Sequence, residues 1–212
     1  MKKGKALVRG AVRPLHRYFR GGKIRRFLEI IGETGRGGLL DVGGGSGISD
    51  EFIDLYKKFE SVTVVNLCPP EIAVPGVKVR VIKADGRDLP FADGSFDWVF
   101  SNAVIEHVGG WQDQQRFAAE IRRVASKGYF VTTPNLYFPI EPHALLPLYQ
   151  FYPPKLKRLA LQISPGYLSE VEDINLLTKS QMKLLFPDAN VTAVNARSSL
   201  IAFASSRVSR GR

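Results

Sequence analysis

Three glycines at two-residue spacing, Gly43, Gly45 and Gly47, follow an apolar pair and Asp41. Glycine adopts positive φ readily and lets a ligand approach the backbone where a Cβ would block it. The segment from 48 to 59 has the composition and spacing of a helix, and the free N–H groups at the start of a helix point toward such a ligand. This turn therefore indicates a binding site for a nucleotide-type cofactor.

The glycine spacing distinguishes between two cofactor classes. A dinucleotide-binding turn has the pattern G-x-G-x-x-G. Counted from Gly43 the third position is Ile48, and counted from Gly45 it is Asp50, so the pattern fails in both frames. The spacing D-x-G-x-G-x-G over 41–47 instead resembles the first motif of the class I S-adenosylmethionine-dependent methyltransferases.

A second segment supports the same family. Residues 84–102 read Ala-Asp-Gly-Arg-Asp-Leu-Pro-Phe-Ala-Asp-Gly-Ser-Phe-Asp-Trp-Val-Phe-Ser-Asn. They are similar to the pattern D-x-x-x-LPF-x-x-x-SFD-x-V of small-molecule methyltransferases. The two motifs occur in the family's order, and the resemblance covers about residues 36–135. It implies S-adenosylmethionine as cofactor and S-adenosylhomocysteine as product.

The resemblance also implies roles for individual residues. The glycine turn would pass under the methionine moiety and the ribose, and Asp41 would orient the amino group directly or through water. Asp85 would accept a hydrogen bond from the adenine amine, with Gly86 and Arg87 beside the ring, and Asn102 would lie beneath the sulfonium. The predicted cofactor-binding residues are Asp41, Gly43, Gly44, Gly45, Gly47, Asn66, Leu67, Asp85, Gly86, Arg87 and Asn102.

One position departs from the family. Where the family usually has an Asp or Glu for both ribose hydroxyls, this chain has Asn66. Asn can accept one hydrogen bond and donate another, but it lacks the negative charge that strengthens such bonds. We therefore expect weakened cofactor binding, and a cofactor-binding protein without catalysis stays open as an alternative.

Two of the three histidines fall in predicted site-forming loops and are the candidate catalytic residues: His107, after Glu106, and His143, after Glu141. Methyl transfer needs mainly alignment, because the cofactor carries the reactive group, and a base is needed only for a hydroxyl or a protonated amine. Each histidine can equally be an ordinary hydrogen-bonded loop residue. Two His and two Glu have the ligand types for a metal, but nothing in the sequence fixes their geometry, and no metal is expected.

The methyl acceptor is less clearly indicated. Residues 133–135 are not the N-P-P-[YF] motif of nucleic-acid amino-methylating enzymes, because that motif follows the fourth strand. Residues 132–143 are similar to a segment of bacterial methyltransferases associated with cell-surface glycan and lipid-linked pathways. These features favour a small-molecule, glycan or lipid-linked acceptor methylated on oxygen. An RNA methyltransferase that uses the basic N-terminus is the less favoured alternative.

The elements that must position these residues alternate between strands and helices. Such alternation predicts a doubly wound, mostly parallel α/β sheet, the Rossmann-like methyltransferase fold with seven strands and a terminal antiparallel hairpin. Ligands in such sheets bind at the carboxyl ends of the strands. The predicted strands are 38–42, 62–67, 77–84, 96–101, 128–133, 191–196 and 200–205, and the predicted helices are 23–33, 49–59, 111–125 and 178–186, with Thr178 as N-cap.

The excess of basic residues is confined to the N-terminal part of the chain. Ten of the 30 Lys and Arg lie in residues 1–26, no acid precedes Glu29, and the remaining chain is neutral. We expect residues 1–22 to form a basic arm, either solvated or in contact with an anionic membrane surface or phosphate. Residues 23–212 are expected to form a single methyltransferase domain in which 136–177 is a lid or substrate-side insertion. The single Cys68 suits a reducing cytoplasm, with the inner face of the membrane as a further possible location.

Overall fold

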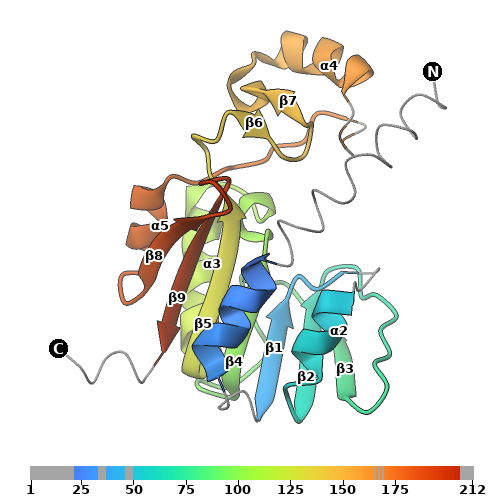
Figure 1. Ribbon diagram of the computed structural model, residues 1–212, viewed down its shortest axis with the longest axis vertical. Helices are drawn as coiled ribbons and strands as arrows, with labels where there is room; N and C mark the ends of the chain where they lie inside the picture. The colour runs from blue at the N-terminus through green and yellow to red at the C-terminus, as the bar shows by residue number, and fades with distance from the viewer. Residues whose placement is uncertain are drawn as a thin grey trace.

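The computed structural model describes residues 22–32, 37–45, 50–164, 166, 168 and 170–205. Their centre is a seven-stranded sheet in the order β3-β2-β1-β4-β5-β9-β8 (Figure 1). Its strands are β1 (Gly38–Val42), β2 (Ser61–Asn66), β3 (Lys78–Lys83), β4 (Phe96–Asn102), β5 (Ala125–Pro134), β8 (Asn190–Val194) and β9 (Ser199–Ser205). The helices against it are 22–31, α2 (Asp50–Tyr56), α3 (Trp111–Val124) and α5 (Lys179–Leu185).

Strands β1 to β5 are parallel, and β9 pairs antiparallel with both β5 and β8. The central strand β1 lies between β2 and β4, with Leu40 opposite Thr63 on one side and Val99 on the other. Strand order therefore reverses beside β1, which is where open α/β sheets bind ligands. The predicted seven-stranded Rossmann-like fold with a terminal hairpin is confirmed, and β3 lies at the sheet edge.

The core has two layers because successive side chains of a strand point to opposite faces. Leu40 and Val99 pack with Phe117 of α3 and Phe186 after α5 on one face. Their neighbours Leu39 and Phe100 pack on the other face, against Phe27 of the helix over 22–31 and against α2. Figure 1 shows these helices on opposite sides of the sheet.

The segment between β5 and α5 forms a small layer beyond the carboxyl end of β5 (Figure 1). It contains the strand pair β6 (Ile140–Glu141) and β7 (Leu146–Pro147), the short helix η3 (Tyr149–Phe151) and helix α4 (Pro154–Ile163). It has its own small apolar cluster, formed by Ala144, Tyr149, Ala160, Leu161 and Leu168. We call residues 136–177 the lid segment.

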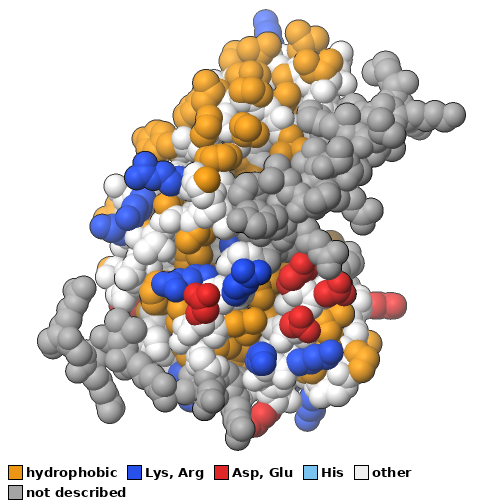
Figure 2. Space-filling model, in the orientation of Figure 1, with side chains coloured by type: hydrophobic (Ala, Val, Ile, Leu, Met, Phe, Trp, Pro, Cys, Tyr) orange, Lys and Arg blue, Asp and Glu red, His pale blue; other side chains and the backbone are white. Residues whose placement is uncertain are grey.

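Helix α4 exposes apolar side chains. Leu156, Leu159 and Ile163 are spaced three and four residues apart, so they share one helix face, and they are 44%, 60% and 80% exposed. The neighbouring face carries Lys155 and Arg158, both exposed. Hydrophobic side chains gather over the lid segment on the face seen in Figure 2, whereas acidic side chains gather over the sheet half.

Element boundaries follow the sequence patterns closely. Helix α5 begins after Thr178, whose side chain accepts a hydrogen bond from the backbone of Gln181 while the Gln181 side chain accepts one from the Thr178 backbone. This reciprocal capping box confirms the predicted N-cap. The predicted basic arm, His16 and Gly47 lie outside the described residues.

Candidate functional site

A cavity of about 310 Å³ opens at the carboxyl ends of the parallel strands. Its volume is at the lower end of the range for ligand pockets. Its walls come from the ends of β1 and β2, the loop after β3 and the loop after β4. The predicted site residues that line it are Gly43, Asn66, Leu67, Asp85, Gly86, Arg87 and His107.

The glycine turn has a conformation that requires glycine at its first position. Gly43 has φ of +87°, and a Cβ there would lie 2.3 Å from Cγ2 of Val104 in the loop after β4. Its N–H donates to the carbonyl of Val65 over 2.7 Å, which extends the pairing of β1 and β2 into the turn. The turn is therefore held between the ends of β2 and β4.

Asn66 links the glycine turn to β2. Its Nδ2 donates to the carbonyl of Gly44 over 2.9 Å, and its Oδ1 accepts from the N–H of Cys68 over 2.9 Å. The side chain thus shapes the turn and the loop that follows β2. Nδ2 also contacts the carbonyl of Gly43 at 3.5 Å, so the second lone pair of Oδ1 is the hydrogen-bonding position that remains for a ligand in the cavity.

Asp41 lies beneath the turn rather than in the cavity wall. It is only 2% exposed, and its Oδ2 accepts a 2.5 Å hydrogen bond from the hydroxyl of Tyr56 in α2. Burial raises the pKa of Asp41 to about 7, although the bond from Tyr56 acts in the opposite direction. A Cβ on Gly44 would lie 2.9 Å from the same carboxylate oxygen, so the carboxylate directly underlies the turn.

Asp85 and Arg87 form an ion pair on the opposite wall. Arg87 Nε lies 3.0 Å from Asp85 Oδ1, and Arg87 Nη2 lies 2.6 Å from Oδ2. The guanidinium also contacts Asp113 over 3.1 Å, which connects the loop to α3. Hydrogen bonds from Arg87 lower the pKa of Asp85. Asp85 is therefore an oriented carboxylate that retains exposed oxygen surface at the cavity.

Gly86 allows the same loop to pack against α3. A Cβ there would lie 2.6 Å from Cε2 of Phe117 and 3.0 Å from Cγ1 of Val42. Any larger residue would push the loop and Asp85 into the cavity.

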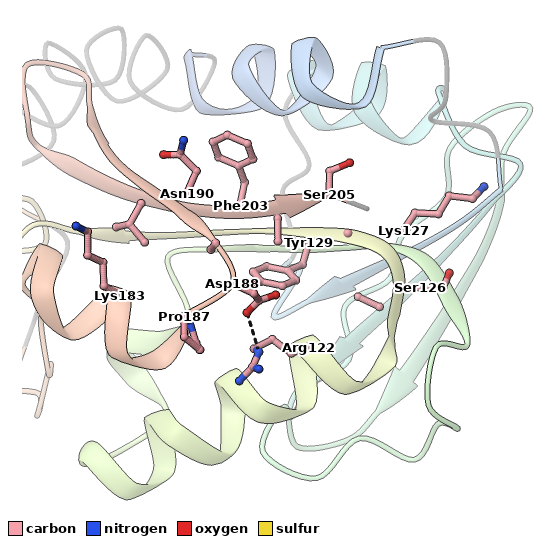
Figure 3. A pocket seen from close by; sticks show the side chains of 15 residues that line it. Arg122, Ser126, Lys127, Tyr129, Lys183, Pro187, Asp188, Asn190, Phe203 and Ser205 are labelled. Carbon is pink, nitrogen blue, oxygen red and sulfur yellow. Dashed lines mark ion pairs between the residues drawn. The ribbon is translucent and has the colours of Figure 1, made fainter. Parts of the chain in front are cut away.

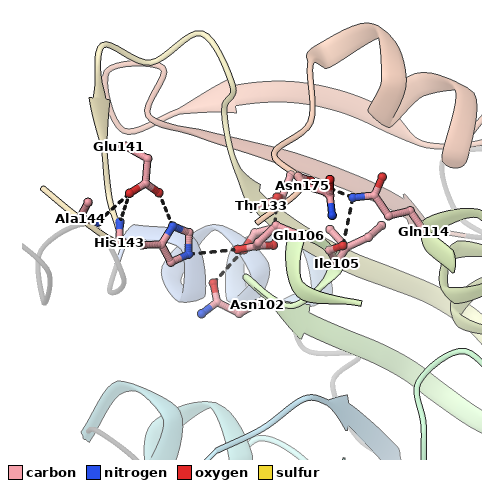
Figure 4. A network of polar contacts seen from close by, with 10 residues as sticks. Asn102, Ile105, Glu106, Gln114, Thr133, Glu141, His143, Ala144 and Asn175 are labelled. Carbon is pink, nitrogen blue, oxygen red and sulfur yellow. Dashed lines mark hydrogen bonds and ion pairs between the residues drawn. The ribbon is translucent and has the colours of Figure 1, made fainter. Parts of the chain in front are cut away.

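A polar network lies behind the loop after β4 (Figure 4). The ring nitrogen Nδ1 of His143 contacts the carboxylate of Glu141, and Nε2 of His143 faces Oε1 of Glu106 at 4.0 Å. The ring of His107 lies edge-on to that of His143, with 5.1 Å between the ring centroids. Asn102 lies nearby, its Oδ1 accepting from the Thr132 hydroxyl over 2.8 Å.

The two candidate catalytic histidines differ in exposure. His107, in the short helix η2 (Ile105–His107), is exposed and lines the cavity. His143 is 3% exposed and reaches the cavity only through His107 and Glu106. Of the two, His107 is therefore the one positioned to contact a substrate.

Glu106 is a buried acid within this network. It is fully buried, and its Oε2 accepts from the hydroxyl of Thr133 over 3.0 Å, while Oε1 has no hydrogen-bond partner. Burial raises the pKa of Glu106, and the nearby positive charge of Lys23 opposes that shift. The sequence placed Glu106 beside a candidate histidine but carried no signal that it would be buried.

A second, larger cavity of about 600 Å³ lies at the other end of the sheet (Figure 3). It is bounded by the starts of β5 and β8, and an ion pair of 3.0 Å between Arg122 and Asp188 crosses its wall. None of the predicted site residues lines it. Ligands of such sheets bind at the carboxyl ends of the strands, so the smaller cavity is the candidate functional site.

The chain resembles known proteins mainly in its first two thirds. Residues 40–132 match the family model described as a methyltransferase domain. Ajmaline N-methyltransferase of Rauvolfia serpentina is 34% identical over 100 residues, which are 42% of this chain and 33% of that protein. 2-Methyl-6-phytyl-1,4-hydroquinone methyltransferase 1 of Oryza sativa subsp. japonica is 33% identical over 95 residues, 42% of this chain and 28% of that protein.

A solved structure extends the likeness of the fold. Magnesium protoporphyrin IX methyltransferase of Synechocystis PCC 6803, solved with bound S-adenosylhomocysteine, aligns with a TM-score of 0.57 at 13% identity. The alignment covers 88% of this chain and 83% of that one. The chain spans about a third of the length of the two curated relatives.

Proposed function

We propose that this chain, whose residues 40–132 match a methyltransferase domain, is a class I S-adenosylmethionine-dependent methyltransferase that binds S-adenosylmethionine and transfers its methyl group to a small-molecule acceptor. The observation that carries the proposal is the cavity at the carboxyl ends of the strands, lined by Gly43, Asp85 and Gly86 from the two family motifs and by Asn66 at the end of β2. S-Adenosylhomocysteine would be the product. The named relatives act on different compounds, so they support the reaction class more than any one acceptor.

The geometry supports a specific orientation of the cofactor. The adenine would lie beside Asp85 and Gly86, where an exposed carboxylate oxygen can accept from its amine. The ribose would lie at Asn66, whose Oδ1 offers one remaining lone pair as an acceptor. The methionine moiety would lie over Gly43 and Gly44, with its ammonium above the buried Asp41.

The acceptor would approach from the side of His107, which lines the cavity. We propose methylation on oxygen, with His107 as the general base that takes the proton of an acceptor hydroxyl and His143 as a positioning residue behind it. A positioned base contributes about 10²–10⁴-fold to such a step. The lid segment, adjacent to this opening, would supply further contacts to the acceptor.

Replacing Asp85 by Ala is expected to weaken S-adenosylmethionine binding by about 10- to 100-fold. A hydrogen bond to a charged group contributes about 1.5–3 kcal/mol, and about 1.4 kcal/mol corresponds to tenfold in affinity. The substitution also removes one of the two carboxylates that hold the Arg87 guanidinium and leaves Asp113 as its acidic partner. Isothermal titration calorimetry of the wild-type protein and the variant measures the difference.

The matched control is Asp188→Ala, which removes the acid of the ion pair at the other end of the sheet. Its cofactor affinity should equal that of the wild type. Equal affinities of the Asp85→Ala variant and the wild type would contradict the proposed adenine contact. Absence of any binding by the wild-type protein at millimolar S-adenosylmethionine would contradict the proposed function itself.

The sequence analysis leaves two alternative functions open, and methyl-transfer assays distinguish them. An RNA methyltransferase would use the basic arm, which lies outside the described residues, and would methylate RNA in preference to glycan lipids. A cofactor-binding protein without catalysis would bind S-adenosylmethionine but transfer nothing. The hydrogen bonds of Asn66 favour the catalytic reading, because they maintain the shape of the turn without an acidic residue.

Helix α4 favours a lipid-linked acceptor at an anionic membrane surface. Its exposed Leu156, Leu159 and Ile163 lie next to a basic face, the arrangement of a helix that lies in a membrane interface. None of the described helices is long and apolar enough to cross a bilayer. We therefore propose that the protein works in the cytoplasm and contacts the inner face of the membrane through the lid segment.

Ile163→Asp should reduce binding to vesicles of anionic phospholipid by at least about tenfold, because it places a charge in the exposed apolar face. Lys155→Glu should reduce binding to the anionic vesicles by about fivefold or more and leave binding to zwitterionic vesicles unchanged, since each basic residue near such a surface contributes about 1 kcal/mol. Co-sedimentation with the vesicles measures both effects.

The control for this experiment is Leu184→Asp on α5, where an apolar side chain is 71% exposed outside the lid segment. It should bind vesicles as the wild type does. Wild-type binding by Ile163→Asp, or an equal loss in Leu184→Asp, would contradict the membrane contact and leave the methyltransferase proposal untouched.

A further inference from the structure

Three side chains with metal-binding atoms converge beside the cofactor cavity. Glu106 and His107 come from η2 after β4, and His143 comes from the loop between β6 and β7. One ligand atom from each lies within 4.8 Å of the others. Ligand atoms at about 2.0–2.2 Å from a tetrahedral ion are about 3.4 Å apart, so rotamer adjustments of about an ångström would bring all three onto one ion.

His143 is oriented as a metal ligand would be. Its Nδ1 contacts the carboxylate of Glu141, which must accept, so Nδ1 carries the proton and Nε2 presents its lone pair toward Glu106. Glu141 is itself held by the N–H groups of His143 and Ala144, over 3.0 and 2.6 Å. A carboxylate that fixes the tautomer of a histidine in this way is the usual outer shell of a metal site.

Glu106 supplies an unsatisfied anionic atom. Its Oε2 is held by Thr133, whereas Oε1 is buried without a hydrogen-bond partner and lies 4.0 Å from His143 Nε2. That distance is too long for a hydrogen bond but suits two atoms that bind the same ion. Lys23 contributes one positive charge to the surroundings of Glu106.

We propose that Glu106, His107 and His143 bind a divalent transition metal ion at the edge of the cofactor cavity, with Zn²⁺ the ion that two imidazoles and one carboxylate fit best. Hard ions such as Mg²⁺ prefer sites built from oxygen ligands, whereas imidazole suits zinc, copper, iron and nickel. The sequence alone predicted no metal because the proximity of the two loops could not be seen in it.

The consequence for the reaction rests on the proposed methyltransferase function. Three protein ligands leave an open position on a tetrahedral ion, and the exposed side of the cluster is His107, which lines the cavity. An acceptor oxygen bound there would be held near the transferred methyl group and would lose its proton to water in the cavity more readily. With the ion bound, His107 would be a ligand, and the ion would replace the general-base role proposed for His107. The substrate class implied is an acceptor with an oxygen donor suited to metal binding, such as a phenol or a vicinal diol.

The experiment uses the full chain, freed of metal with a chelator, and Co²⁺ as a spectroscopic probe for Zn²⁺. We expect one Co²⁺ per chain with visible absorption bands of a low-coordinate site, displaced by one equivalent of Zn²⁺. His143→Ala and Glu106→Gln should each lower Zn²⁺ affinity by at least about 100-fold. Glu141→Gln, which keeps an acceptor for the backbone N–H groups, should lower it by about 10- to 100-fold, as outer-shell changes do.

Asp188→Ala is the matched control, because it removes a carboxylate at the other end of the sheet and should leave the affinity unchanged. Wild-type affinity in both His143→Ala and Glu106→Gln, or no stoichiometric binding of Co²⁺ or Zn²⁺ by the wild-type protein, would overturn the inference. Circular dichroism establishes that each variant is folded. S-Adenosylmethionine binding is measured separately, so metal binding without cofactor binding would contradict the proposed function and keep the metal site.

Discussion

Replacing Gly43 by Ala is expected to destabilise the protein by about 2–5 kcal/mol and to lower its affinity for S-adenosylmethionine by more than about tenfold. The φ of +87° at Gly43 costs a residue with a Cβ about 1–2 kcal/mol. The added methyl group would also lie 2.3 Å from Val104 Cγ2, and forcing extra atoms into a packed site costs about 1–3 kcal/mol. Chemical denaturation and calorimetry measure the two effects.

The loss of affinity should exceed what the loss of stability explains, because the turn and the loop after β4 both border the cavity. Val104 immediately precedes η2, which carries Glu106 and His107. A displaced Val104 would therefore disturb the cofactor side and the acceptor side together. The double variant Gly43→Ala with Val104→Ala should recover part of the stability, since it removes the overlap but keeps the unfavourable φ.

Two other glycines provide controls. A Cβ at Gly45 or Gly110 meets nothing within 4 Å, and neither residue has positive φ. Gly45→Ala should leave stability unchanged within about 0.5 kcal/mol. Gly110→Ala, at the N-cap of α3, should lower stability by no more than about 1 kcal/mol and leave cofactor affinity unchanged. If Gly43→Ala had the stability and the cofactor affinity of the wild type, the turn would tolerate a side chain at this position. The expected overlap with Val104 would then be contradicted.

The strands and helices were predictable because their signals are local. Buried parallel strands are continuous apolar runs, and the observed strand boundaries lie within three residues of the predicted ones. Helix α5 was predictable from Thr178, whose capping box involves residues only three positions apart. The order of the strands in the sheet was not predicted, because it depends on contacts between strands far apart in the sequence.

The lid segment and the polar network were not predictable, because local sequence patterns carry no signal for them. Strands β6 and β7 have two residues each, too short for any periodicity. The approach of His143 to Glu106 joins segments more than 30 positions apart. Nothing local indicated that Glu106 is buried, since it lies between an apolar residue and a histidine in a loop-like stretch.

For the predicted cofactor-binding residues, the positions were predictable from the sequence, but the hydrogen-bond partners of the side chains were not. The types of Asp41, Asn66 and Asp85 were enough to predict a cavity wall at these positions, and the structure brings Asn66 and Asp85 to it. Their partners were not indicated. Tyr56 lies in a different element from Asp41, and Asn66 bonds to the backbone of the glycine turn, so each side chain has a structural task in addition to the proposed one.

The buried Asp41 should make the stability of the protein fall as pH rises from about 4 to about 7. Its pKa is about 7 in the folded protein and about 3.9 in an unfolded chain. Between these values the folded state holds a proton that the unfolded state has released, so raising the pH favours unfolding. A difference of about three units corresponds to about 4 kcal/mol, reached in full above pH 7.

Asp41→Asn removes this titration and can still accept the hydrogen bond from Tyr56. The variant should match the wild type below about pH 4 and become more stable than it by up to about 4 kcal/mol above pH 7. The two proteins are compared at each pH because other acids also make stability depend on pH. The raised pKa of Glu106 changes stability in the same direction as Asp41. The lowered pKa values of Asp85, Asp97 and Glu120 change it in the opposite direction. Urea denaturation between pH 4 and pH 8 gives both curves.

The same carboxylate should couple cofactor binding to pH. If the ammonium of S-adenosylmethionine lies above Asp41, it favours the charged carboxylate, so binding releases a proton near neutral pH and affinity rises as pH increases from 6 to 8. In Asp41→Asn the affinity should be lower at pH 8 and should lose this increase. Calorimetry in buffers of different ionisation enthalpy counts the released protons. Parallel affinity curves for the two proteins would contradict the amino-group contact, whereas parallel stability curves would contradict the buried charge itself.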